Sequence, residues 1–222
     1  MNDTAVVLCS GGLDSCVTTA IAAENYDLAL LHLNYGQLTE KRELKAFTDI
    51  ADHYQVKKRL VIDIRYLAEI GGSALTDKTI AVPSNGIAEG IPVTYVPFRN
   101  ANILAMAVSW AETLNAKKIY IGAVEEDSSG YPDCRESFFN AYNQMIKLGT
   151  KDSSDIEIVT PLIHLNKGEI VRLGISKNAP LQLSWSCYQA EELACAVCDS
   201  CRLRLNGFRQ AGVPDPISYS IH

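Results

Sequence analysis

Short apolar segments alternate with longer amphipathic segments along most of this chain. We expect strands at Ala5–Cys9, Leu28–Asn34, Arg59–Ile64, Lys118–Gly122 and Glu157–Thr160. Between them, apolar residues recur at helical spacing, and we expect helices at Ser15–Glu24, Thr39–Tyr54, Asn100–Leu114 and Arg135–Leu148. Strands that alternate with helices of this length are typical of βαβ units, so the pattern predicts an α/β fold with a doubly wound, mostly parallel sheet.

The apolar pattern also indicates where such a sheet would bind a ligand. The first, second and fourth expected strands are largely apolar, as when helices cover both faces of the sheet. Ligands of these sheets bind beyond the carboxyl ends of the strands, which selects Ser10–Ser15, His32–Gln37 and Gly122–Asp127. Residues Ala68–Val96 are rich in Gly and Pro and have no clear period, so we expect a long functional loop there.

The segment Ser10–Ser15 follows the first expected strand and begins a helix, with the sequence Ser-Gly-Gly-Leu-Asp-Ser. The first N–H groups of a helix have no partner inside it, and the helix dipole places partial positive charge there. The glycines let the backbone curve around an anion, and the two serines add hydroxyl donors. The pattern therefore predicts a phosphate-binding loop. The alternative is an ordinary strand–turn–helix in which Asp14 or Ser15 only caps the helix.

Size and charge restrict the class of protein. The chain has 222 residues, of which 47% are hydrophobic, and can bury the core of one domain with a small appendage. Its net charge of −6 argues against a nucleic-acid-binding surface, which is normally basic. The polar start does not resemble a signal peptide, and no apolar run reaches the ~18 residues of a membrane span. We expect a soluble cytoplasmic protein with no membrane and no direct nucleic-acid partner.

Four cysteines crowd near the C-terminus, at Cys187, Cys195, Cys198 and Cys201. Their spacing, C-x7-C-x2-C-x2-C, brings the thiolates together within a turn or two of chain, and four cysteines form a common closed zinc site. We expect one structural Zn²⁺, with an iron–sulfur cluster or buried free thiols as alternatives. The expected organisation is a nucleotide-binding α/β domain at residues 1–180 and a zinc-binding subdomain at residues 181–222.

Several motifs together resemble a known family. The segment Ser10–Ser15 matches the S-G-G-x-D-S loop of the PP-loop ATP pyrophosphatase superfamily. Other matching segments, in order, are Asn34–Gln37, Val96–Asn100, Tyr131–Arg135, Leu183–Tyr188 and Cys195–Arg204. With these segments the chain resembles the 7-cyano-7-deazaguanine synthase family of queuosine biosynthesis, from about Val6 to Pro216.

The resemblance implies a chemical reaction. Members of the family convert 7-carboxy-7-deazaguanine, ATP and ammonia into 7-cyano-7-deazaguanine. A carboxylate is a poor electrophile, so ATP must first activate it as an acyl-adenylate, with pyrophosphate leaving. Ammonia then gives an amide, and a second activation leaves the nitrile. The resemblance also implies Mg²⁺ with ATP, free ammonia as the nitrogen source and a homodimer.

It further implies roles for individual residues. The ATP site is expected at Leu8, Cys9, Ser10, Gly11, Gly12, Leu13, Asp14, Ser15, Cys16, Val17, Thr18, Arg99 and Asn100. Catalytic roles are expected for Asp14 near the magnesium, for Ser15 in the loop, for Lys167 at the pyrophosphate and for Asp127 at metal or substrate. The alternative without a functional role is that Lys167 is a solvent-exposed residue at the start of a helix. For Arg99, the alternative is an ordinary surface arginine.

Tyr131, Asp133 and Arg135 are the expected contacts to the deazaguanine. A tyrosine can stack on the ring, a carboxylate accepts from a guanine-like N–H edge, and an arginine forks onto the substrate carboxylate. The alternative is an ordinary proline-containing turn.

Two other classes of function remain open at this point. The first keeps the fold and changes the substrate, as in another PP-loop amidating ligase or a tRNA sulfur transferase. Sulfur transfer needs a catalytic cysteine near the loop, and RNA binding needs a basic face that this acidic composition does not suggest. The second is a zinc-binding interaction module without catalysis, which would not turn over ATP.

Overall fold

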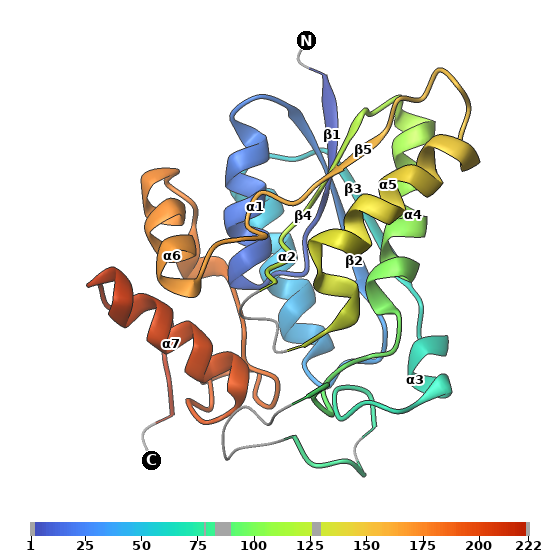
Figure 1. Ribbon diagram of the computed structural model, residues 1–222. Helices are drawn as coiled ribbons and strands as arrows, with labels where there is room; N and C mark the ends of the chain where they lie inside the picture. The colour runs from blue at the N-terminus through green and yellow to red at the C-terminus, as the bar shows by residue number, and fades with distance from the viewer. Residues whose placement is uncertain (1–2, 78, 83–89, 126–129, 221–222) are drawn as a thin grey trace.

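Alternating strands and helices make up the computed structural model, which describes residues 3–77, 79–82, 90–125 and 130–220 (Figure 1). The strands are β1 (Thr4–Leu8), β2 (Asp27–Asn34), β3 (Lys58–Asp63), β4 (Lys118–Ile121) and β5 (Glu157–Val159). The helices are α1 (Leu13–Ala23), α2 (Glu40–His53), α3 (Tyr66–Ile70), α4 (Arg99–Leu114), α5 (Glu136–Gly149), α6 (Lys167–Ser176) and α7 (Asp199–Ala211). Short 3₁₀ turns lie at Pro132–Cys134 and Leu181–Leu183.

The strands form one parallel sheet in the order β3-β2-β1-β4-β5. The chain builds one half of the sheet from β1 to β3 and then returns to add β4 and β5 on the other side of β1. The expected α/β fold with a doubly wound parallel sheet is therefore confirmed. The point between β1 and β4, where the strand order reverses, is where such sheets bind their ligands.

Helices cover both faces of the sheet (Figure 1). Helices α4 and α5 pack over one face, in a core that contains Val6 and Leu8 of β1. Helices α1, α2 and α6 pack over the other face, in a core that contains Ala5 and Val7 of the same strand. Successive side chains of a strand point to opposite faces, so β1 contributes to both cores and is buried along its apolar length. The loop that follows β1 is consequently held by the most buried strand of the fold.

All the expected strands and helices are present, with small shifts at their ends, and the structure adds α3, α6 and α7. Helix α6 begins with a capping box, in which the Asn166 side chain accepts from the Glu169 N–H and the Glu169 carboxylate accepts from the Asn166 N–H. Helix α7 begins directly after Cys198. None of the helices in the described part of the chain has the length and apolar character of a membrane span.

Gly122 allows the end of β4 to lie against the first turns of α1. A Cβ atom at this position would lie 2.8 Å from the backbone carbon of Asp14 and 2.9 Å from Thr18 Oγ1. A side chain there would push α1 away from β4, and with it the loop after β1.

We predict that Gly122→Ala lowers the free energy of unfolding by about 1–3 kcal/mol, because the added methyl group meets backbone atoms. Urea unfolding followed by circular dichroism measures this change. Gly149→Ala is the matched control: a Cβ at Gly149 meets nothing within 4 Å, so its effect stays within about 0.5 kcal/mol. Equal stability of the two variants would contradict the close approach of β4 and α1.

Candidate active site and metal centre

A cavity of about 300 Å³ lies beyond the carboxyl ends of β1, β2 and β4. The loop after β1, the strand ends and the start of α4 form part of its lining. The rest comes from the Tyr131–Cys134 turn, Lys167 and the C-terminal region. The C-terminal residues are Trp185, Ser186, Tyr188, Asp199, Ser200, Leu203 and Arg204. The cavity therefore lies at the reversal point of the sheet, with walls from both ends of the chain.

The loop after β1 is fixed by its own hydroxyls and by its neighbours. Gly11 has φ of +88°, and a Cβ on it would lie 2.6 Å from the Glu43 carbonyl oxygen, so the position requires glycine. The Gly12 N–H donates to Ser10 Oγ at 3.2 Å, and Ser15 Oγ donates to the Gly12 carbonyl at 3.0 Å. The Trp185 N–H donates to the Gly11 carbonyl at 2.8 Å. The loop thus has a defined shape before any ligand binds.

Lys167 and Asp14 form an ion pair at the edge of this loop. Lys167 Nζ lies 2.9 Å from Asp14 Oδ1 and 2.7 Å from Asp14 Oδ2, and both residues line the cavity. Asp14 lies in the first turn of α1, and Lys167 is the first residue of α6. The pair brings together two side chains separated by most of the chain. A lysine here gives the cavity a point positive charge, and a carboxylate offers oxygen ligands of the kind Mg²⁺ prefers.

Arg99 and Tyr35 form a second polar group on the cavity wall. Arg99 Nη1 donates to Tyr35 Oη at 3.1 Å, and the guanidinium lies over the Tyr35 ring. Burial raises the pKa of Tyr35 to about 12, so its phenol is neutral. Asn100 lines the cavity beside Arg99.

The expected ATP residues divide between the cavity and the packing around it. Those that line the cavity are Leu8, Cys9, Ser10, Gly12, Leu13, Asp14, Ser15, Arg99 and Asn100. Cys16, Val17 and Thr18 are fully buried in α1, and Gly11 is engaged by Trp185 and α2. The assignment of all these residues to ATP remains a prediction.

The expected substrate residues divide in a similar way. Tyr131 lines the cavity and shares a hydrogen bond of 2.7 Å with Thr94. Asp133 lies outside the described lining and is buried, and its Oδ2 accepts from the Asn100 N–H at 2.9 Å. Arg135 is exposed and also lies outside that lining. Asp127 falls outside the described residues. Asp133 thus holds the start of α4 in place, and the substrate roles remain predictions.

Sequence reasoning overlooked the contribution of α7 and of Glu43 to the cavity. The α7 residues on the lining are Asp199, Ser200, Leu203 and Arg204. Their positions i, i+1, i+4 and i+5 lie on one face of a helix, a signal that the sequence contains. From the sequence, the cysteine spacing indicates only metal binding for this segment and gives no sign that α7 also lines the cavity.

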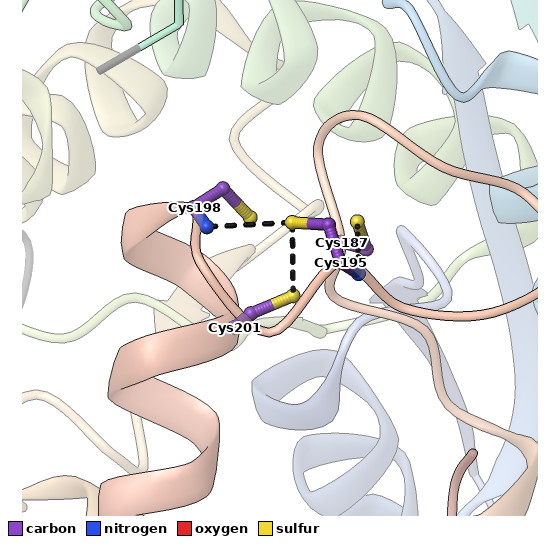
Figure 2. A group of neighbouring side chains, drawn as sticks. All are labelled: Cys187, Cys195, Cys198 and Cys201. Atoms are coloured by element: carbon purple, nitrogen blue, oxygen red, sulfur yellow. Dashed lines mark hydrogen bonds between the residues drawn. The ribbon is translucent and has the colours of Figure 1, made fainter. Parts of the chain in front are cut away.

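The four C-terminal cysteines come together as expected from their spacing (Figure 2). Their Sγ atoms all lie within 4.8 Å of one another. The Cys195 N–H donates to Cys187 Sγ at 3.4 Å, and the Cys198 N–H donates to Cys195 Sγ at 3.3 Å. Hydrogen bonds from Cys198 and Cys201 lower the pKa of the Cys187 thiol. Four close sulfur atoms with backbone donors that stabilise thiolate charge fit a metal centre.

Arg204 lies on the same helix as Cys201 and lines the cavity. Its side chain is buried and forms a forked ion pair with Asp215, at 2.8 Å from Nε and 3.0 Å from Nη2. It also donates to Ser184 Oγ at 2.8 Å and to the Leu181 carbonyl at 3.2 Å. The segment that Arg204 holds contains Trp185, which binds Gly11. Helix α7, the four-cysteine cluster and the loop after β1 are therefore linked by direct contacts.

A family model and two similar proteins of known name all point to the same family. A family model described as "Queuosine biosynthesis protein QueC" matches residues 4–212. The chain is similar to the 7-cyano-7-deazaguanine synthase of Chlorobium phaeobacteroides, with 59% identity over 97% of this chain and 96% of that protein. It is 58% identical to the 7-cyano-7-deazaguanine synthase of Chloroherpeton thalassium, over 98% of this chain and 97% of that protein.

We predict that the purified protein contains about one metal ion per chain, held by the four cysteines. Elemental analysis of freshly and anaerobically purified protein measures the amount and separates zinc from iron. Cys195→Ser should lose the metal and melt at a lower temperature, because a thiolate ligand is removed. Cys134→Ser, which changes a buried cysteine outside the cluster, should keep the metal. A metal content well below one in the unaltered protein would contradict the site.

Proposed function

The chain belongs to the family of the queuosine biosynthesis protein QueC, and we propose that it is an ATP-dependent ligase that forms 7-cyano-7-deazaguanine from 7-carboxy-7-deazaguanine and ammonia. The observation that carries the ligase proposal is the shared cavity. The Ser10–Ser15 loop, Lys167 and Arg99 border the same space as Tyr131. Phosphate-binding groups and a ring-stacking side chain therefore lie within reach of one pair of reactants.

In the proposed first step, the loop and Lys167 stabilise the charge of the leaving pyrophosphate. A carboxylate oxygen of the substrate attacks the α-phosphorus of ATP, and the bond from that phosphorus to pyrophosphate breaks. The hydroxyls of Ser10 and Ser15, with the N–H groups at the start of α1, face the developing negative charge. Mg²⁺, when bound with ATP, neutralises part of the triphosphate charge, and Asp14 is its proposed ligand.

Lys167 can pair with Asp14 when the cavity holds no nucleotide and with a phosphate oxygen when ATP is bound. In the structure it pairs with Asp14. Phosphate oxygens compete for the same ammonium group, so ATP binding would release the Asp14 carboxylate for magnesium. The two side chains are therefore placed to exchange partners when the nucleotide enters.

In the proposed later steps, ammonia attacks the activated carboxyl group to give an amide, and a second activation removes the amide oxygen to leave the nitrile. Tyr131 is the candidate for stacking on the deazaguanine, supported by its place on the cavity wall. Asp133, Arg135 and Asp127 remain the sequence-based candidates for the other substrate contacts. The hydrogen bond from Asn100 to Asp133 supports a positioning role for that carboxylate as well.

We propose that Cys187, Cys195, Cys198 and Cys201 hold one structural Zn²⁺, whose binding supplies folding free energy to residues 181–222. In this division, residues 1–180 form the nucleotide-binding domain. The zinc-binding subdomain completes the cavity, because α7 contributes to its wall. With four protein ligands, the metal has no position left for substrate.

The proposed location is the cytoplasm, and the proposed assembly is a homodimer. No disulfide joins any of the seven cysteines, all of which lie in the described residues, and this fits a reducing compartment. The homodimer rests on the resemblance to the family, and sedimentation equilibrium of the purified protein measures it.

Product analysis tests the function. We predict that the protein, supplied with ATP, Mg²⁺, ammonia and 7-carboxy-7-deazaguanine, yields the nitrile by mass spectrometry. Lys167→Met should lower kcat/KM by about 10²- to 10³-fold, because one charge that stabilises the leaving pyrophosphate is lost.

Lys177→Met is the matched control, since Lys177 follows the same helix and pairs with the exposed Glu24 at 2.8 Å. Its activity should equal that of the unaltered enzyme. An amide or sulfur-containing product would favour another PP-loop enzyme, and ATP left intact would favour a zinc-binding module.

A further inference from the structure

Glu43 is an acidic side chain on the cavity wall that the proposed activation of the carboxyl group does not use. It lies on the first turns of α2, and its backbone oxygen packs directly against Gly11 of the phosphate-binding loop. The carboxyl group is therefore on the helix that touches the loop where the substrate would be activated. An acidic group in this place can exchange protons with a reactant in the cavity.

Both oxygens of the Glu43 carboxyl group have hydrogen-bond partners. Gln37 Nε2 donates to Oε2 at 3.2 Å, and Thr39 Oγ1 donates to Oε1 at 2.9 Å. The Tyr35 N–H donates to Gln37 Oε1 at 2.9 Å, which fixes the amide with its NH₂ group toward Glu43. The carboxyl group is thus held in one position.

The Thr39 hydroxyl makes this arrangement tolerant of either protonation state. It lies within hydrogen-bonding distance of both Glu43 Oε1 and the Cys187 carbonyl, at 2.9 and 3.3 Å. When Glu43 is ionised, the hydroxyl donates to it. When Glu43 is protonated, the carboxyl can donate to the hydroxyl, which then donates to the Cys187 carbonyl. The Thr39 hydroxyl can therefore stay bonded to the Glu43 carboxyl group when that group gains or loses a proton.

Burial, together with the neighbouring groups, leaves the Glu43 carboxyl group partly ionised at neutral pH. Burial raises its pKa to about 7, although the bonds from Thr39 and Gln37 and the charge of Arg99 act in the opposite direction. Glu40, on the same helix, raises it further. Tyr35 is the other titratable group facing it, and its phenol is neutral. A base works best when its pKa lies near the working pH.

We propose, on the basis of the proposed function, that Glu43 is the catalytic base that takes a proton from ammonium before the nitrogen attacks the activated carboxyl group. At neutral pH most dissolved ammonia is protonated and has no free electron pair. A base in the cavity produces the nucleophile where it reacts and lets the enzyme draw on the abundant ammonium ion.

Ammonium gives one proton to the Glu43 carboxylate, and the nitrogen electron pair forms a bond to the carbonyl carbon of the acyl-adenylate. The bond from that carbon to the phosphate oxygen breaks, and AMP leaves with the electron pair. The nitrogen releases a second proton to water. The products are the amide, AMP, protonated Glu43 and one proton in solution, and Glu43 later returns its own proton to solvent.

Glu43→Gln tests the assignment, because it keeps the shape and removes the base. Pyrophosphate exchange into ATP, dependent on 7-carboxy-7-deazaguanine, measures activation without ammonia and should stay within about twofold of the unaltered enzyme. Turnover with ammonium at pH 7 should fall by about 10²- to 10⁴-fold. Hydroxylamine, which is a neutral nucleophile at pH 7, should react in the variant at nearly the unaltered rate.

The pH dependence of kcat/KM for ammonia separates a catalytic base from a structural residue, because a purely structural role of Glu43 would not change the shape of the profile. For the unaltered enzyme, kcat/KM for total ammonia should level off above about pH 7, where Glu43 is ionised. In Glu43→Gln it should keep rising about tenfold for each pH unit, following free ammonia. Thr39→Val keeps the base but removes a donor that lowers its pKa, so the levelling should move to higher pH.

Asp49→Asn is the control, because it removes a charge from the same helix where Asp49 pairs with Lys45. It should match the unaltered enzyme in every assay. Parallel loss of exchange and turnover in Glu43→Gln, or a profile that still levels off near pH 7, would overturn the assignment. An unaltered enzyme without carboxylate-dependent exchange would instead overturn the proposed function, and the base with it.

Discussion

The structure depends on the contacts that hold the loop after β1 in place. Gly11 has no room for a side chain because the Glu43 carbonyl oxygen lies against it, and its own carbonyl is bound by the Trp185 N–H. On another side, Gly122 brings β4 against Asp14. His32, buried in β2, adds a hydrogen bond of 3.0 Å to the Cys9 carbonyl. A loop held from these directions can present its N–H and hydroxyl donors to phosphate without a large change in shape.

The same contacts explain why the four-cysteine cluster lies beside the cavity. Helix α7 begins between two of the cysteines, and Arg204 ties the helix to Ser184 and Asp215. Trp185 then joins that segment to the loop. Removing a buried partner from an ion pair such as Arg204–Asp215 leaves a charge unpaired at a cost of about 3–5 kcal/mol. The segment that carries the four cysteines thus forms part of the cavity wall and is held to the rest of the fold by these contacts.

Much of this arrangement could be predicted from the sequence, because it rests on local patterns. The apolar strands, the Ser10–Ser15 loop and the cysteine spacing each carry their own signal. The pairing of Asp14 with Lys167 and the bond from Thr39 to the Cys187 carbonyl join residues far apart in the chain, and no local pattern encodes them. Asp133 is another example: the proline turn predicts a ligand contact, and the structure adds a hydrogen bond to the backbone of Asn100 that the turn alone does not indicate.

The most direct measurement is a crystal structure of the protein with Mg²⁺ and an ATP analogue that resists cleavage between the α and β phosphates. We predict that the β and γ phosphates lie against Ser10–Ser15, with Lys167 moved from Asp14 onto a phosphate oxygen. A triphosphate bound elsewhere, with the Lys167–Asp14 pair intact, would contradict it.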